Sequence, residues 1–220
     1  MIQTINETKS NALINNQINQ IINLINLGNF QDALLIGQSL VEASENNPNV
    51  LSIMGMLNVK LGSHEDAIRY FRKVVKIRPY CALSSYKLAN ALNLTGQQEA
   101  AISSYKQAIR YKKNYADAHY GLGNVYSSVS NYKKAVTHYK EAIRFQPQLA
   151  AAHNNLGTAL TRLGRQNEAM DSYHSAISIK PDYSEAYHNL AVIQNICGKN
   201  EQAIVTCLKS IEINPNLFLA

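Results

Sequence analysis

The chain has 220 residues, of which 21 are Lys or Arg and 15 are Asp or Glu, so its formal net charge is +6. It contains no long apolar run, and its N-terminus lacks the basic and apolar segments of a secretory signal, so we expect no membrane span and no leader. Cys81, Cys197 and Cys207 have no spacing typical of a metal or redox site, and a reducing cytoplasm fits them best.

The most regular feature of the sequence is a period of 34 residues. Glycines and prolines recur with the same period at other positions, such as Gly62 and Gly96 or Pro147 and Pro181. Such a period is typical of a repeat protein, whose function lies on a surface built by stacked units. Alanine marks one position of every period: Ala33, Ala67, Ala101, Ala135, Ala169 and Ala203.

Within one period, the residues predict two antiparallel helices joined by short turns. Gly62 precedes Ala67 by five positions, which suits a glycine that closes one helix in a left-handed conformation before the next helix begins. Apolar residues from Ala135 to Ile143 follow helical spacing, and Pro147 marks the end of that helix. No segment has the alternation of a strand.

Taken in chain order, the period predicts a single array over residues 1–220. Residues 1–10 are expected to form a lead-in or an extra helical turn. The first unit has a polar, asparagine-rich first helix, as expected for the end of an array. A further unit is expected to begin at 218, which suggests the front piece of a longer protein. The units are 14–47, 48–81, 82–115, 116–149, 150–183 and 184–217.

Two units carry a recognisable motif. Residues 116–148 read ADAHYGLGNVYSSVSNYKKAVTHYKEAIRFQPQ, and residues 151–182 read AAHNNLGTALTRLGRQNEAMDSYHSAISIKPD. Both resemble the tetratricopeptide repeat, with its Leu-Gly pair, tyrosine, small alanines and terminal proline. The family's first-helix aromatic is replaced, for example by His119 and His153. Over residues 14–217 the resemblance implies an all-α fold, a right-handed α-solenoid of tetratricopeptide helix-turn-helix repeats.

The sequence offers no catalytic constellation. No two histidines lie three or four residues apart, and there is no Cys-x-x-Cys pair. Gly121 and Gly123 imitate a phosphate loop but fall inside a predicted helix. We therefore expect no enzyme activity in this chain, no metal site and no cofactor. His119 and His153 are expected to pack in place of aromatics, and Cys207 is expected to fill the core in the row of Tyr173.

Recognition is the remaining function. In tetratricopeptide proteins the first helices line a concave groove, and this resemblance implies a lining rich in amides and hydroxyls. Asparagine can pair with both the N–H and the C=O of an extended peptide. The lining is similar to the asparagine-lined superhelix of O-linked N-acetylglucosamine transferases, although asparagine is abundant throughout the chain. The lining residues are Tyr86, Asn90, Asn93, Tyr120, Asn124, Ser127, Asn154, Asn155, Thr158, Arg162, His188, Asn189 and Asn195.

One known binding mode of the family is not expected. Chaperone-binding members hold a C-terminal carboxylate with two lysines, an arginine and two asparagines. The asparagines match Asn124 and Asn155, but the basic positions hold Tyr120, Glu185 and Asn189. A clamp without cations cannot bind a carboxylate by charge-assisted hydrogen bonds.

Residues 48–149 hold 15 basic against 5 acidic residues, and part of this charge follows the period. The periodic cations should form a basic stripe on the convex face, made of second helices. It could bind an acidic protein, a nucleic acid or an anionic membrane surface. The alternative is that these charges only keep an exposed face solvated. We do not expect nucleic acid binding. The stripe consists of Arg72, Lys76, Lys106, Arg110, Lys140 and Arg144.

These observations predict a scaffold that binds a partner protein or an extended peptide in the concave groove. One alternative is the substrate-docking N-terminal arm of a larger enzyme such as a glycosyltransferase, and another is docking on the basic stripe. Self-association is expected through the apolar side of the last unit, which includes Ile204, Cys207, Leu208 and Ile211.

Overall fold

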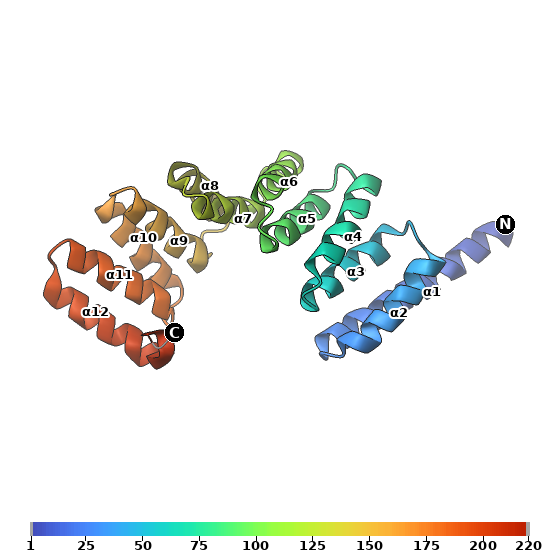
Figure 1. The fold of residues 1–220 in the computed structure, drawn as a ribbon, viewed down its shortest axis with the longest axis horizontal. Helices are drawn as coiled ribbons and strands as arrows, with labels where there is room; N and C mark the ends of the chain where they lie inside the picture. The colour runs from blue at the N-terminus through green and yellow to red at the C-terminus, as the bar shows by residue number, and fades with distance from the viewer. Residues whose placement is uncertain (1, 219–220) are drawn as a thin grey trace. The chain divides into compact units, whose positions relative to one another are not determined.

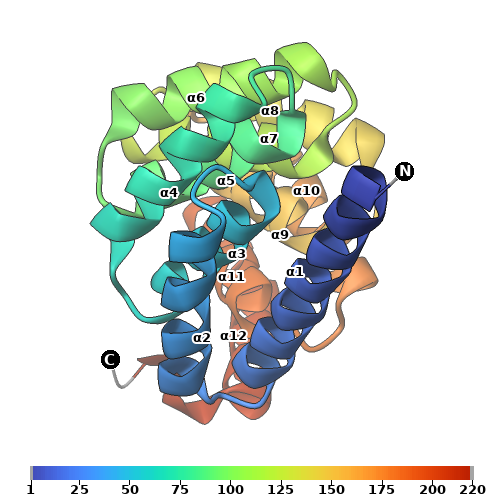
Figure 2. The same cartoon turned by 90° about the vertical axis from the view of Figure 1, so that its right-hand side faces the viewer.

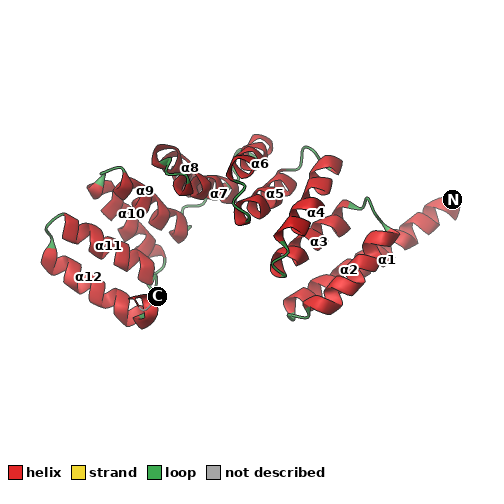
Figure 3. Cartoon of the chain, in the orientation of Figure 1, coloured by secondary structure: helices red, strands yellow, loops and turns green. Residues whose placement is uncertain are grey.

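The computed structural model describes the backbone of residues 2–218 and the side chains of residues 12–216 (Figure 1). Leu219 and Ala220, where the predicted further unit continues, lie outside the described residues. Within residues 2–218 the chain forms twelve α-helices and a short 3-10 helix and no strand, which confirms the all-α prediction (Figure 3). None of these helices is long and apolar enough to cross a membrane.

The chain divides into two halves, residues 1–111 and 112–220, which are described separately. The first holds α1 (Ile2–Asn26), α2 (Phe30–Ala43), α3 (Pro48–Lys60), α4 (His64–Ile77), α5 (Ala82–Leu94) and α6 (Gln98–Tyr111). The second holds α7 (Ala116–Ser128), α8 (Tyr132–Phe145), α9 (Ala150–Arg162), α10 (Gln166–Ile179), α11 (Ser184–Ile196), α12 (Asn200–Ile213) and the 3-10 helix Pro215–Phe218.

Helices α1 and α2 pack as an antiparallel pair (Figure 2). Helix α1 is 25 residues long against 14 for α2, so the expected lead-in is a continuous part of the first helix. From α3 onward, each odd-numbered helix begins 34 residues after the previous one, from Pro48 to Ser184. This spacing confirms the helix-turn-helix repeat, while the single array and its unit boundaries stay predictions.

The turn inside each pair needs a left-handed residue. Gly62 has φ +76°, and the N–H of the next residue, Ser63, donates to the carbonyl of Asn58 at 2.8 Å, which closes helix α3. The expected glycine is missing between α7 and α8, and Ser130 adopts φ +58° there. A residue with a Cβ is strained in this conformation, whereas glycine is not.

In the pairs α3–α4, α7–α8 and α9–α10, a ring from the second helix helps to fill the core. Phe71, Tyr139 and Tyr173 are buried, and each lies against the glycine of the preceding first helix. A Cβ built on Gly123, for instance, would come within 2.6 Å of the Tyr139 ring, so the helices could not approach as closely. This contact gives the glycine of the Leu-Gly pair its physical role.

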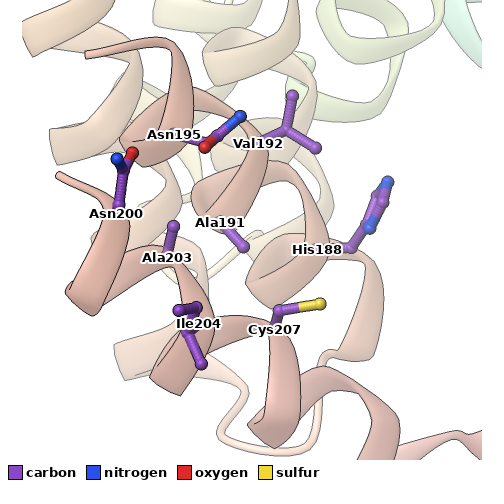
Figure 4. A pocket seen from close by; sticks show the side chains of 8 residues that line it. All are labelled: His188, Ala191, Val192, Asn195, Asn200, Ala203, Ile204 and Cys207. Carbon is purple, nitrogen blue, oxygen red and sulfur yellow. The ribbon is translucent and has the colours of Figure 1, made fainter. Parts of the chain in front are cut away.

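The last member of this row is Cys207, whose side chain is smaller than a ring. A cavity of about 340 Å³ lies between α11 and α12, as Figure 4 shows. Cys207 is half-buried and lines the cavity, so it does not fill the core as Tyr173 does. The cavity is lined by His188, Ala191, Val192, Asn195, Asn200, Ala203, Ile204 and Cys207.

We predict that Ser130→Gly stabilises the protein by about 1 kcal/mol, because it removes the strain of a left-handed serine. Thermal or urea unfolding followed by circular dichroism measures the change. Ser103→Gly, an exposed position inside α6, is the control and should lower stability, since glycine weakens a helix interior. Equal destabilisation by both substitutions would contradict the account of this turn.

We also predict that Cys207→Leu raises the free energy of unfolding by about 1 kcal/mol, because the longer side chain covers more of the apolar lining and, unlike a ring, does not need a glycine in place of Ala191. Cys207→Ala enlarges the cavity and should act in the opposite direction. Denaturant unfolding of the three proteins tests the ranking. If alanine proved as stabilising as leucine, incomplete filling of this space would not be the reason.

Candidate peptide-binding surface

The predicted lining residues lie on first helices in both halves. Tyr86, Asn90 and Asn93 belong to α5, and the remaining ones belong to α7, α9 and α11. Arg162 is exposed at the end of α9, and His188 and Asn195 line the cavity beside Cys207. The other lining residues of the second half include a set of side chains that contact one another.

Side-chain amides link the first helices of the second half. The Nδ2 group of Asn155 on α9 donates to the Tyr120 hydroxyl at 3.1 Å and to Oδ1 of Asn124 at 3.0 Å, both on α7. Asn189 on α11 repeats the arrangement by donating from Nδ2 to Oδ1 of Asn154 at 3.0 Å. These five residues form what we call the amide ladder, a structural role that the sequence alone did not reveal.

Buried tyrosines on second helices donate hydrogen bonds to asparagines on first helices. The Tyr139 hydroxyl on α8 donates to Oδ1 of Asn124 at 2.9 Å, and the Tyr105 hydroxyl donates to Asn90 in the first half. Burial raises the pKa of both tyrosines well above the usual range, so the hydroxyls stay protonated and act as donors. The carbonyl oxygen of Asn124 is therefore fixed by two donors.

These tyrosine pairs have a constant separation in the sequence, which is a signal that could have predicted them. Each hydroxyl bonds a residue 15 positions earlier, and Tyr173 accordingly contacts Thr158 at 3.3 Å. Where the aromatic row lacks a hydroxyl, the residue 15 positions earlier is apolar: Met56 precedes Phe71, and Val192 precedes Cys207. The first helix thus carries a polar residue at this position where the second helix carries a tyrosine hydroxyl, and an apolar residue where it does not.

The ladder leaves some hydrogen-bonding groups available. Both lone pairs of Asn124 Oδ1 are used, but its Nδ2 group has no partner among the described residues. Asn189 donates one of its two N–H groups, and its carbonyl oxygen has no partner in the same part of the chain. A cavity of about 310 Å³ beside Asn124 is lined mainly by polar groups, including Ser127, Asn155 and Thr158. This surface offers both donors and acceptors.

The histidines near the ladder have structural partners. His119 is buried on α7, and its Nε2 lies 3.1 Å from the carbonyl oxygen of Lys113. His153 on α9 repeats this contact at 3.0 Å from the carbonyl of Pro147. No group of three or more His, Cys, Asp or Glu suited to a metal ion occurs among the residues that the structure describes.

The predicted basic stripe is exposed but partly neutralised. Arg72 and Lys76 lie on α4, Lys106 and Arg110 on α6, and Lys140 and Arg144 on α8. On α8, Nζ of Lys140 lies 3.9 Å from Glu168, and Arg144 pairs with Glu141, whose pKa this bond lowers. In the second half, both cations of the stripe therefore have carboxylate partners.

Comparison with known proteins identifies the repeats. The family model described as TPR repeat matches residues 89–129, 130–164 and 157–195. The model described as Tetratricopeptide repeat matches residues 48–81 and 184–217. No curated protein matches the chain.

Several solved structures share the fold. The crystal structure of MamA is 26% identical, covers 74% of this chain and 95% of its own, and gives a TM-score of 0.70. YrrB, described as a TPR protein with an unusual peptide-binding site, is 20% identical, covers 83% of this chain and 94% of its own, and gives 0.68. MamA from Desulfovibrio magneticus RS-1 is 18% identical, covers 78% and 97%, and gives 0.72.

The last two likenesses concern the fold alone, because their identity is low. The family models, by contrast, match the sequence of the repeat over residues 48–81 and 89–217, which is most of the chain. The chain therefore belongs to the tetratricopeptide repeat family.

Proposed function

We propose that this chain is a protein-interaction scaffold and that α7, α9 and α11 bind an extended peptide mainly through its backbone. The observation that carries the proposal is the amide ladder, which leaves Nδ2 of Asn124 and Oδ1 of Asn189 without partners among the described residues. A peptide carbonyl can accept from the first group, and a peptide N–H can donate to the second. The peptide-binding site ascribed to YrrB supports this reading.

The ladder favours binding because it holds these amides before a peptide arrives. Both N–H groups of Asn155 are bonded to α7, so its side chain is fixed between the helices. Asn124 is fixed in turn by Tyr139. A peptide that binds here does not have to order these side chains, so less conformational entropy is lost.

The neutral lining favours backbone recognition over recognition of charged side chains. The ladder contains no charged residue, and the basic positions of the chaperone clamp remain Tyr120, Glu185 and Asn189. Each backbone hydrogen bond should contribute on the order of 1 kcal/mol. Affinity should therefore depend on several such bonds and little on peptide sequence.

We predict that Asn124→Asp weakens binding of peptides selected from a random display library on the immobilised chain by about tenfold. Aspartate keeps an acceptor for Tyr139 and Asn155 but removes the two outward N–H donors. Fluorescence anisotropy with the selected peptides gives the dissociation constants. Asn167→Asp, an exposed position on α10, is the matched control for the added charge and should bind as the wild type does.

A second set of peptides tests the backbone directly. N-methylation of single peptide bonds removes one N–H at a time and should weaken binding at defined positions, whereas exchange of side chains should matter little. Unchanged affinity for Asn124→Asp, or dependence on side chains alone, would contradict the proposal.

A further inference from the structure

A lysine on α5 makes the same pattern of contacts in the first half as a ladder asparagine makes in the second. Nζ of Lys87 lies 2.8 Å from Oγ of Ser52, 35 residues earlier, and 3.1 Å from Sδ of Met56, 31 residues earlier. Asn155 bonds residues at the same two separations, Tyr120 and Asn124. Lys87 therefore takes the place of a ladder amide, with a full positive charge.

The ammonium group of Lys87 has uncharged acceptors among the described residues. A hydroxyl and a thioether face it, and a thioether is a weak acceptor. Among the described residues, no carboxylate lies within salt-bridge distance of this lysine. Burial lowers its pKa, because the half-buried charge has lost part of its water. An added anion would compensate this loss.

Two cavities meet at Lys87, and Met56 and Lys87 line both of them. One measures about 200 Å³ and is otherwise lined mainly by apolar groups, including Ile25 and Phe71. The other measures about 270 Å³, and its apolar lining includes Ile22, Ile53 and Leu83. Among the described side chains, no carboxylate lines either cavity, whereas Lys60 borders the first and Arg78 the second.

We propose that the surface of α1, α3 and α5 around Lys87 binds an acidic, apolar peptide segment. Its carboxylate side chain meets Nζ of Lys87, and apolar side chains on either side enter the two cavities. Charge complementarity selects this occupant, because the described residues that border the cavities include three cations and no carboxylate. A polyanion such as a nucleic acid would satisfy the charges but leave the apolar cavities unused.

This site differs from the amide ladder in position and in chemistry. It lies in the other half of the chain, and it depends on a side-chain charge rather than on peptide backbone groups. It needs no terminal carboxylate, since the acid is a side chain within the segment. A variant that abolishes binding at one of these sites should therefore leave binding at the other unchanged.

The test uses a short peptide with blocked ends, flanked by glycine and serine, that contains Leu-Leu-Glu-Leu-Leu. Two matched peptides carry Leu-Leu-Gln-Leu-Leu, which lacks the charge, and Ser-Ser-Glu-Ser-Ser, which lacks the apolar groups. Fluorescence anisotropy against the full chain should show saturable binding of the first peptide and at least about tenfold weaker binding of both others.

Variants assign the effect to Lys87. Lys87→Met should bind the acidic peptide about tenfold more weakly and bind the glutamine peptide at least as well as the wild type does. Lys87→Arg should restore binding of the acidic peptide. Lys73→Met, at an exposed position on α4, is the control for removal of a charge, and Asn124→Asp separates this site from the ladder. Circular dichroism confirms that each variant folds.

Three results would overturn the proposal. The first is no saturable binding of the acidic peptide by the wild-type chain. The second is equal affinity of Lys87→Met and wild type for that peptide. The third is equal binding of the serine peptide with displacement by heparin, which would identify a general polyanion surface instead.

Discussion

The packing of three helix pairs depends on the close contact between a second-helix ring and a first-helix glycine. Tyr139 and Tyr173 can pack this closely against α7 and α9 only because Gly123 and Gly157 have no Cβ. The same contact carries the hydroxyl of each ring to the edge of the first helix, where it meets Asn124 or Thr158. One steric fit thus determines both how the core packs and where the polar groups lie on the candidate peptide-binding surface.

This coupling accounts for different surfaces on different helix pairs. Where the ring is tyrosine, the first helix carries an acceptor, and an amide ladder can form in front of it. Where the ring is Phe71, the partner is Met56, and the surface beside it is apolar with the charge of Lys87. The presence or absence of one buried hydroxyl group in the second helix is therefore accompanied by a polar or an apolar surface on the first helix.

Much of the fold could be predicted from the sequence, because period, glycine and proline act locally. The helix pairs, their turns and the left-handed glycines all followed from these signals, and Ser130 filled the missing place with the same geometry. The side-chain bonds could not be predicted in the same way. Asn155 was recognised as a lining residue, but its two bonds to α7 depend on packing between units. Lys87 and its cavities were missed, since a lone lysine in an apolar helix face has no motif.

The ladder bonds also bear on how an array of this kind can change length. Each bond joins residues 31 or 35 positions apart, and these separations bracket the repeat length of 34. Gene duplication or loss of one intact unit would bring residues at equivalent positions to the same separations, so a bond could form again wherever the new neighbours are a donor and an acceptor. An insertion of a few residues would instead move donors away from acceptors in all bonds that cross it. The surface can therefore be lengthened or shortened only in whole units, each of which brings its own chemistry.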